Sequence, residues 1–255
     1  MAGYRALVRP DIREVMSVVT TAYQEADNVL VAETAVGLAR QFDPRAELVG
    51  AAGFGRTNER TLFVVRVKAS VRRALLLLVH NSHRGEGAVR FRLVELDLPD
   101  GSVLAPDVPH AALSVSHVGA VEKRLKDLHL HDQVATYLAE TERAWGRLGH
   151  RFWSPRHTKA LVRELWGHPK PPVAIDGRAL EPSTSWPRHP KDHLTRSLDD
   201  VDDAASAYRR VCRYLDHESE ARERGDLTKD RDERLALGTG MRLKERVWDW
   251  VVENA

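Results

Sequence analysis

The fold is decided by residues 47–96, which read ELVGAAGFGRTNERTLFVVRVKASVRRALLLLVHNSHRGEGAVRFRLVEL. Apolar segments rich in Val, Leu and Phe alternate here with polar segments that contain Gly, Asn and Ser. Short apolar segments bounded in this way are typical of strands joined by turns. We therefore expect three or four strands that form one antiparallel sheet.

The predicted strands follow one another closely along this region. They cover Glu47 to Phe54, Thr61 to Lys68, Ala74 to Val79 and a later segment around residues 89–93. Residues 55–60 have the composition of a hairpin loop between the first two. Because residues 74–79 are apolar throughout, we expect a central strand that is covered on both faces.

Positive charge is concentrated in the same region. Between Arg56 and Arg92 the chain has nine Lys or Arg residues and two acidic residues, a net charge of +7 (9 − 2), whereas the whole chain has a net charge of +2. A basic segment in a nearly neutral protein indicates an anionic partner.

Alternation along the strands predicts where these charges lie. Side chains point to opposite faces of a strand in turn, so Arg66 and Lys68 should lie opposite the apolar residues between them. Arg90 and Arg92 have the same relation to their apolar neighbours in the later strand. We expect all four cations to share one face of the sheet, as the contact surface for the anion. The alternative is that this face is only the solvated side of an antiparallel sheet.

The first forty residues predict a hairpin followed by a helix. Segments 4–8 and 14–21 are rich in Val and aromatic residues, and the turn signal Arg9-Pro10-Asp11 separates them. A helix stays open as the alternative for the second segment. Asp27 then offers an N-cap for a helix that ends near Phe42.

A long helix is predicted from Ser116 to Gly149. Apolar residues recur at every third or fourth position of this segment, Ser116 can act as the N-cap, and Gly149 is a stop signal. The helix would be roughly 45 Å long if unbroken and could lie across the inner face of the sheet. His129 and His131 would diverge on it, so we do not expect them to share a metal ion.

The remaining residues predict helices around a proline-rich segment. One helix begins at Ser154-Pro155, in the order that favours a helix start, and others are expected at 199–215 and 241–252. Residues 167–196 contain six of the twelve prolines, as is typical of a linker or surface excursion. The fold class is therefore α+β, an antiparallel sheet with a long helix packed on it and further helices at the C-terminus. We divide the chain into a core domain of residues 1–166, a linker of residues 167–196 and a helical segment of residues 197–255.

Length and composition limit the class of protein. With 255 residues, 42% hydrophobic and 30% charged, the chain can bury one good core, perhaps with a smaller helical appendage. The longest apolar run, residues 74–79, is far shorter than a membrane span, and residues 1–4 begin no signal pattern, so we expect a cytoplasmic protein that does not bind membranes. The single cysteine, Cys212, excludes an internal disulfide bond and is expected to be a packed apolar residue.

Several short motifs resemble one known family. They lie in the order Val8-Arg9-Pro10-Asp11, Val18-Val19 with Tyr23, residues 51–55 (AAGFG), residues 81–90 (NSHRGEGAVR) and Ser116-His117. This order resembles the phage/plasmid-like proteins that carry domain of unknown function 932. The resemblance covers about residues 4–145, with a weaker one near residues 236–250, and it leaves open whether an N-terminal segment is missing before Met1.

The chain departs from the pattern of that family at the most polar positions. Members typically show Asn-Ser-His-Asp-Gly-Ser before an Ala-Val-Arg strand and Arg-His-Thr at the start of the long helix. Here Arg84 replaces the aspartate, Glu86 replaces the serine, and Val115-Ser116-His117 stands at the second motif. Any chemistry that uses that aspartate is therefore in doubt for this chain.

The resemblance implies a genetic context for the protein, but it does not imply a particular reaction. The family has no settled activity, and its members look like cargo of phages, plasmids and integrated elements, which implies DNA processing or defence-related binding. The order of strands and long helix is also similar to the βββα core of single-strand-annealing recombinases, which hold unpaired DNA along a basic groove of an oligomeric ring. That second similarity is one of fold, and fold does not determine function.

Our leading hypothesis is a sequence-tolerant nucleic-acid-binding protein, with single-stranded DNA favoured, no cofactor and a possible homo-oligomer. Arginine suits phosphate binding because its planar guanidinium can bind two oxygens at once. Phe54, Phe63 and Phe91 are the only aromatic residues in the basic region, which weakens a mechanism based on base stacking. The predicted contact residues are Arg66, Lys68, Arg72, Arg73, Asn81, His83, Arg84, Arg90 and Arg92.

Two alternatives remain open. A metal-assisted hydrolase could use His80, His83 and His117 with a carboxylate such as Glu86, although neither HExxH nor a comparable pattern is present and we predict neither catalytic nor metal-binding residues. Residues 81–83 are more simply explained as a turn whose side chains bond the backbone. The other alternative is an assembly or regulatory module of a mobile element, which would associate with itself through the long helix.

Overall fold

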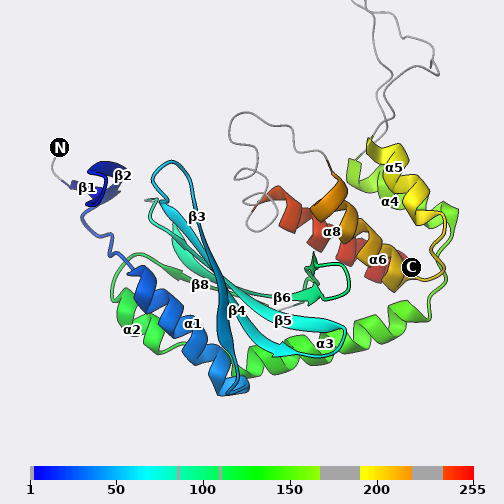
Figure 1. Cartoon of the computed structure of the whole chain (residues 1–255), viewed down its shortest axis with the longest axis horizontal. Coiled ribbons are helices and arrows are strands. Elements are labelled where there is room, and N and C mark those ends of the chain that lie inside the picture. The colour runs from blue at the N-terminus through cyan, green and yellow to red at the C-terminus, as the bar shows by residue number, and fades with distance from the viewer. Residues whose placement is uncertain (1–2, 85–86, 109–110, 167–189, 220–237) are drawn as a thin grey trace, which may run out of the picture.

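The computed structural model describes residues 3–84, 87–108, 111–166, 190–219 and 238–255 (Figure 1). The chain is α+β, as predicted, with a strongly curved antiparallel sheet and helices on both of its sides. The strands are β1 (Tyr4–Arg9), β2 (Glu14–Thr20), β3 (Glu47–Phe54), β4 (Arg60–Ala69), β5 (Arg73–Ser82), β6 (Ala88–Asp97), β7 (Ser102–Leu104) and β8 (Ala112–Ser116). The helices are α1 (Asn28–Phe42), α2 (Val121–Lys126), α3 (His131–Gly149), α4 (Pro155–Trp166), α5 (Pro190–Leu198), α6 (Ala204–Arg213), the π-helical turn η1 (Tyr214–Glu218) and α8 (Thr239–Asn254).

The predicted hairpin and first helix are confirmed. β1 and β2 pair antiparallel and form a small sheet of their own at one end of the molecule (Figure 1). The Asp27 carboxylate accepts hydrogen bonds from the backbone N–H groups of Val29 and Leu30, which satisfies two donors at the start of α1. The helix ends at Phe42, as expected.

The main sheet follows the chain closely. Its strands lie in the order β3-β4-β5-β6-β7, and β8 pairs with the same edge of β6 that β7 uses further along. The predicted strands correspond to β3, β4, β5 and β6, with β5 in the centre. The short strands β7 and β8 were not predicted, because their few apolar residues carry too little periodicity to indicate a strand.

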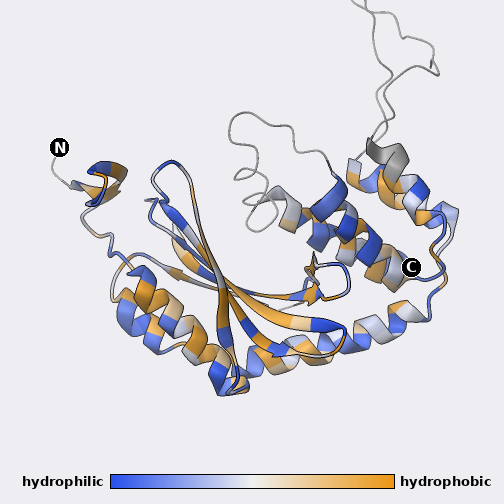
Figure 2. Cartoon of the chain, viewed as in Figure 1, coloured by the Kyte–Doolittle hydropathy of each residue, from blue (hydrophilic) through white to orange (hydrophobic). Residues whose placement is uncertain are grey.

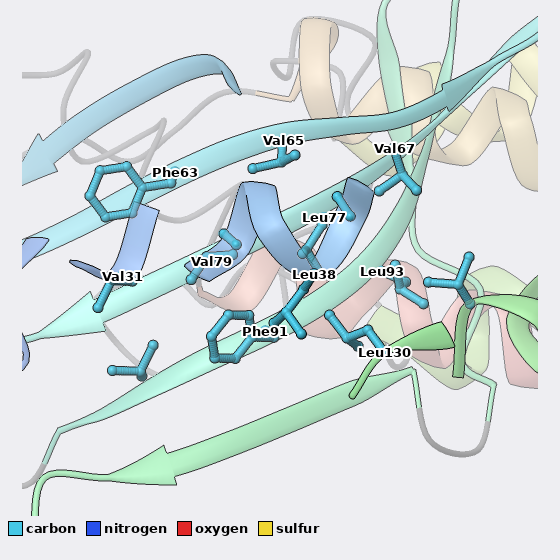
Figure 3. Close-up of a cluster of buried hydrophobic side chains, with 14 of the residues drawn as sticks. Val31, Leu38, Phe63, Val65, Val67, Leu77, Val79, Phe91, Leu93 and Leu130 are labelled. Carbon is cyan, nitrogen blue, oxygen red and sulfur yellow. The ribbon is translucent and has the colours of Figure 1, made fainter. Parts of the chain in front are cut away.

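One face of the sheet holds the larger core. Phe63, Val65, Leu77 and Phe91 point from the strands toward α1, whose Leu38 packs among them (Figure 3). Figure 2 shows the apolar residues concentrated along the middle of the strands, with polar residues at the turns. α3 completes this layer with its N-terminal half, so both helices cover the same face.

The opposite face is apolar at one end and covered there by the C-terminal helix. Leu76, Leu78 and Val94 form a second, smaller cluster with Met241 of α8. A third cluster lies beyond the sheet, where the last turns of α3 pack with α4, α5, α6 and α8 around Trp145 and Tyr208. Since this cluster joins α3 and α4 to the C-terminal helices, packing crosses the boundary that we placed at residue 166.

The prediction of one helix from Ser116 to Gly149 is wrong. Ser116 ends β8, Gly119 has φ +73°, and the helical residues form two pieces, α2 and α3, separated at residues 127–130. Both pieces bury residues in the same core, including Leu125 and Val134. Two helices that pack on the same face of the sheet have the same apolar spacing as one longer helix. Periodicity alone therefore does not distinguish the two cases.

The predictions for the C-terminal part of the chain, after residue 153, are confirmed only in part. α4 begins at Pro155 after Ser154, and α8 contains the predicted closing helix. The helix expected at 199–215 begins only at Ala204, because Asp203 caps it by accepting a hydrogen bond from the Ser206 N–H. The proline-rich segment lies mostly outside the described residues, as does most of the charged segment after residue 217. In the described part of the chain, no helix combines the length and apolar composition needed to cross a membrane.

A candidate anion-binding face of the sheet

Strand pairing determines which basic residues share a face. Arg90 pairs with His80, and Arg92 pairs with Leu78 on the neighbouring strand. Arg66 pairs with Leu76, which belongs to the cluster under α8. Because paired residues point to the same side of a sheet, Arg66, Arg90 and Arg92 lie on the face opposite α1, as predicted.

Lys68 lies on the other face, contrary to prediction. The register of β4 shifts between Arg66 and Lys68, so that Lys68 pairs with Leu75 of the larger core. It lines a hollow of about 250 Å³ that also contains Arg73, Glu95 and Glu142 of α3. Simple alternation fails here because one extra residue in a strand reverses the faces of all residues beyond it.

Four of the predicted contact residues form ion pairs within the protein. Arg73 Nη1 lies 2.7 Å from Glu95 Oε2 and Arg84 Nη2 lies 2.7 Å from Glu59 Oε1. Arg66 pairs with Glu47, and Arg92 pairs with Glu245 of α8. These carboxylates come from four different parts of the chain, and each neutralises a cation that the sequence had suggested for phosphate.

Two of these pairs are structural. Glu95 is 5% exposed and also accepts a hydrogen bond of 3.0 Å from Trp145 Nε1. Glu59 is 4% exposed; burial opposes its ionisation, but hydrogen bonds from its own backbone, Arg84 and Thr57 outweigh burial and lower its pKa. A buried carboxylate needs such a partner, so Arg73 and Arg84 stabilise the fold.

Arg90 and Arg66 are both exposed on the candidate face, but Arg66 pairs with Glu47. Among the described residues, neither Arg90 nor the exposed Arg72 nor Lys68 forms an ion pair with another side chain. Arg72 precedes β5 at the turn after β4 and so lies at the far end of the strands from Arg90. The charge available to a ligand on this face therefore centres on Arg90.

A hollow of about 220 Å³ lies beside Arg90, over β5, β6 and β8. Its lining among the described residues contains no acidic side chain, and consists of Leu78, His80, Arg90, Phe91, Arg92, Ala112, Leu113 and Ser114. The Nε2 atom of His80 is buried and has no hydrogen-bond partner in the part of the chain that the structure describes. Burial, together with the charges of Arg90 and Arg60, lowers the pKa of His80 to about 4. A small cavity with cationic walls and a free hydrogen-bonding nitrogen has the chemistry of an anion site.

The three histidines suggested for a metal ion do not converge. His80 faces this hollow, whereas His83 and His117 lie together in a different place, with ring centroids 6.1 Å apart. In the described ranges, no three side chains of His, Cys, Asp or Glu are arranged to hold a metal ion. Glu86 lies outside the described residues.

His83 and His117 belong to a buried polar cluster that attaches the N-terminal hairpin to the sheet. The His117 ring stacks on Tyr23 at 4.9 Å between centroids, and its Nδ1 lies 3.1 Å from the Gln24 carbonyl oxygen. The hydroxyl of Ser17 in β2 donates to the His83 carbonyl at 2.5 Å. Burial is the main cause that lowers the pKa of both imidazoles.

Asn81 completes this cluster. Its Nδ2 donates to the Ala26 carbonyl at 2.9 Å and to Asn28 Oδ1 at 2.8 Å, next to His83 Nε2. Asn81 is fully buried and His83 is 2% exposed. Contrary to prediction, neither side chain is accessible to a nucleic acid, because both hold the start of α1 against β5. The simpler interpretation, that residues 81–83 bond the backbone locally, also misses these partners, which lie more than fifty residues away.

The three phenylalanines of the basic region are too buried to stack on a base. Phe63 and Phe91 belong to the core under α1, although Phe91 also lines the hollow, and Phe54 is 4% exposed. Cys212 is fully buried, and burial raises the pKa of its thiol to about 12, so it is a packed apolar residue as predicted.

Comparison with known proteins gives no match for this chain: no family model, no curated protein and no solved structure is similar to it. The resemblance to the family with domain of unknown function 932 therefore stays a prediction from the motifs.

Proposed function

We propose that this protein binds nucleic acid through the sugar–phosphate backbone, on the face of the sheet that carries Arg90. The observation that carries the proposal is the hollow beside Arg90, which has two arginines and a histidine and, among the described residues, no acidic side chain in its lining. Phosphate contacts supply most of the affinity of sequence-independent binding.

The surroundings of the hollow support a polymer better than a small metabolite. Arg60 on β4 lies near enough to His80 to influence its pKa, so arginines lie on both strands that flank β5. Arg66 continues the same face toward β3, although Glu47 partly neutralises it. A row of cations along a sheet suits a chain of phosphates.

A single strand is the better candidate than a duplex. Because the hollow is small, about 220 Å³, a flexible backbone can place one phosphate in it at less cost than a stiff duplex. The phenylalanines of the basic region are buried, so we expect no stacking on bases and binding that is tolerant of sequence.

The first testable prediction concerns Arg90. We expect Arg90→Ala to weaken binding of a labelled single strand of roughly 40 nucleotides and to reduce the slope of log affinity against log salt by roughly 0.7, the value for one lost phosphate contact. Fluorescence anisotropy across a salt series measures both quantities, with the matched duplex in parallel.

The control is Arg143→Ala, which removes an exposed cation from α3, on the side of the sheet away from the hollow. This variant should bind as the wild type does. The proposal is wrong if the wild-type protein binds neither strand form at low salt, or if the two variants lose affinity equally.

A further inference from the structure

We infer that the hollow holds one phosphate group, bound jointly by Arg90 and His80, and that His80 takes up a proton from solvent as the phosphate enters. This inference rests on the proposed function, because it identifies the group of the nucleic acid that is recognised and the residue that makes recognition depend on pH. In the bound state His80 is an imidazolium that donates from Nε2 to a phosphate oxygen, and the phosphodiester itself is unchanged.

The position of His80 in the sheet is the first argument. It lies on β5 between Leu62 of β4 and Arg90 of β6, and Arg90 in turn pairs with Ser114 of β8. Its Nε2 is buried and has no partner among the described residues. Buried polar atoms almost always have a hydrogen-bond partner, so an unpartnered ring nitrogen on a residue that lines the hollow indicates a ligand that accepts from it.

The charges around His80 are the second argument. Arg60 of β4 and Arg90 and Arg92 of β6 are cationic, and β8 contributes only the neutral Ser114. Two carboxylates act on Arg92: Glu245 of α8 pairs with it, and Asp107 favours its charged form. In the empty hollow, burial and the neighbouring arginines keep the imidazole neutral.

A bound phosphate reverses this balance. One negative charge beside the imidazole offsets the arginines and favours the charged form, so the pKa of His80 rises on binding. By linkage, binding must then take up a proton and become tighter as the pH falls from the bound-state pKa toward the free-state value of about 4. Leu78 and Ala112 line the same hollow, and their apolar side chains lower the local polarity, which strengthens the interaction between the two charges.

The experiment measures the affinity for an oligonucleotide that has no terminal phosphates, at several pH values between 5.5 and 8. Phosphodiesters do not titrate in this range, so any pH dependence belongs to the protein. We expect the affinity of the wild type to rise by up to about tenfold for each unit that the pH falls, the limit for uptake of one proton. The variant His80→Gln, which keeps a hydrogen-bond donor but cannot become charged, should bind with an affinity that changes little with pH.

The control is His150→Gln, at the exposed C-terminal end of α3, which should keep the wild-type pH dependence. Circular dichroism at each pH checks that every protein remains folded. Binding that is independent of pH in the wild type, or a pH dependence that survives in His80→Gln, overturns this inference and leaves the proposed function in place. An absence of binding at every pH overturns both.

Discussion

At the scale of the residue, several basic side chains form ion pairs with carboxylates of the same chain. Arg73 and Arg84 hold the buried carboxylates of Glu95 and Glu59, and Lys244 in α8, itself fully buried, lies 2.6 Å from Asp216. Removing one member of such a pair leaves an uncompensated buried charge. The count of basic residues between Arg56 and Arg92 therefore overstates the charge that a ligand could contact, and the proposed site rests on Arg90.

Buried histidines make stability depend on pH. His83 and His117 have pKa values below their usual range, with burial as the main cause. Since the unfolded chain binds protons more readily than the folded one, the stabilisation is present above a pH of about 6.5, the ordinary histidine pKa, and is lost as the pH falls toward the folded-state values. His80, with a folded-state pKa of about 4, adds to the same trend.

We therefore expect the urea midpoint to decrease between pH 7 and pH 5. Replacing His117 with Gln should flatten this decrease, because glutamine can keep a hydrogen bond without titrating. Replacing the exposed His150 in the same way should leave the decrease as it is. A wild-type midpoint that rises on acidification would contradict the assignment of neutral, buried imidazoles.

At the scale of the element, alternation predicted faces correctly until a strand became irregular. Arg66, Arg90 and Arg92 share a face as the sequence indicates, but the register shift after Arg66 carries Lys68 to the other side. The shift arises where β4 pairs with β5, so the sequence of β4 alone does not predict it. The two helices that we predicted as one show the same limit, because α2 and α3 both face the larger core.

Two glycines, one in the turn before α2 and one within α3, allow a matched pair of substitutions. Gly119 has φ +73°, and an added Cβ would meet no atom within 4 Å, so any cost of Gly119→Ala is backbone strain of roughly 1–2 kcal/mol. Gly146 lies on the exposed side of α3 with equally open surroundings. Gly146→Ala should stabilise the protein by up to roughly 1 kcal/mol, because alanine favours helix.

Chemical denaturation of the two variants measures both effects. If Gly119→Ala were neutral, the turn between β8 and α2 would adopt a different backbone conformation from the one described. Opposite signs for two substitutions of the same chemistry would show that the conformation of the backbone, and not the added methyl group, determines the outcome.

At the scale of the whole molecule, the candidate face is bounded by a helix from the other end of the sequence. Glu245 of α8 pairs with Arg92, and Met241 packs on the sheet beside it. The motifs around residues 81–90 and 116–117 lie on β5, β6 and β8, the strands of the proposed site, but contacts between residues more than 150 positions apart carry no local signal. Glu95, between Val94 and Leu96 in an apolar strand, was the one partner that the sequence could have revealed, since an acid in such a strand needs a buried cation.

The pairing of Arg92 with Glu245 leads to a further prediction. Glu245→Gln removes the carboxylate that occupies Arg92, so we expect single-strand affinity to rise, by roughly threefold to tenfold at low salt, an energy of about 1 kcal/mol. Anisotropy under the conditions used for Arg90→Ala measures the change. Glu140→Gln, which frees Arg143 on α3 instead, should have little effect, and a loss of affinity in Glu245→Gln would place Arg92 outside the binding surface.

The order of strands also bears on how the chain folds during synthesis. β4, β5, β6 and β7 each pair with the strand that precedes them, so each can join the sheet as soon as it leaves the ribosome, and few long loops need to close. The N-terminal hairpin is different, because its partners lie far along the chain: Arg9 donates to the Thr57 carbonyl, 48 residues later, and Ser17 donates to the His83 carbonyl, 66 residues later. The first segment to be translated therefore cannot dock at these positions of the main sheet until those residues have been synthesised.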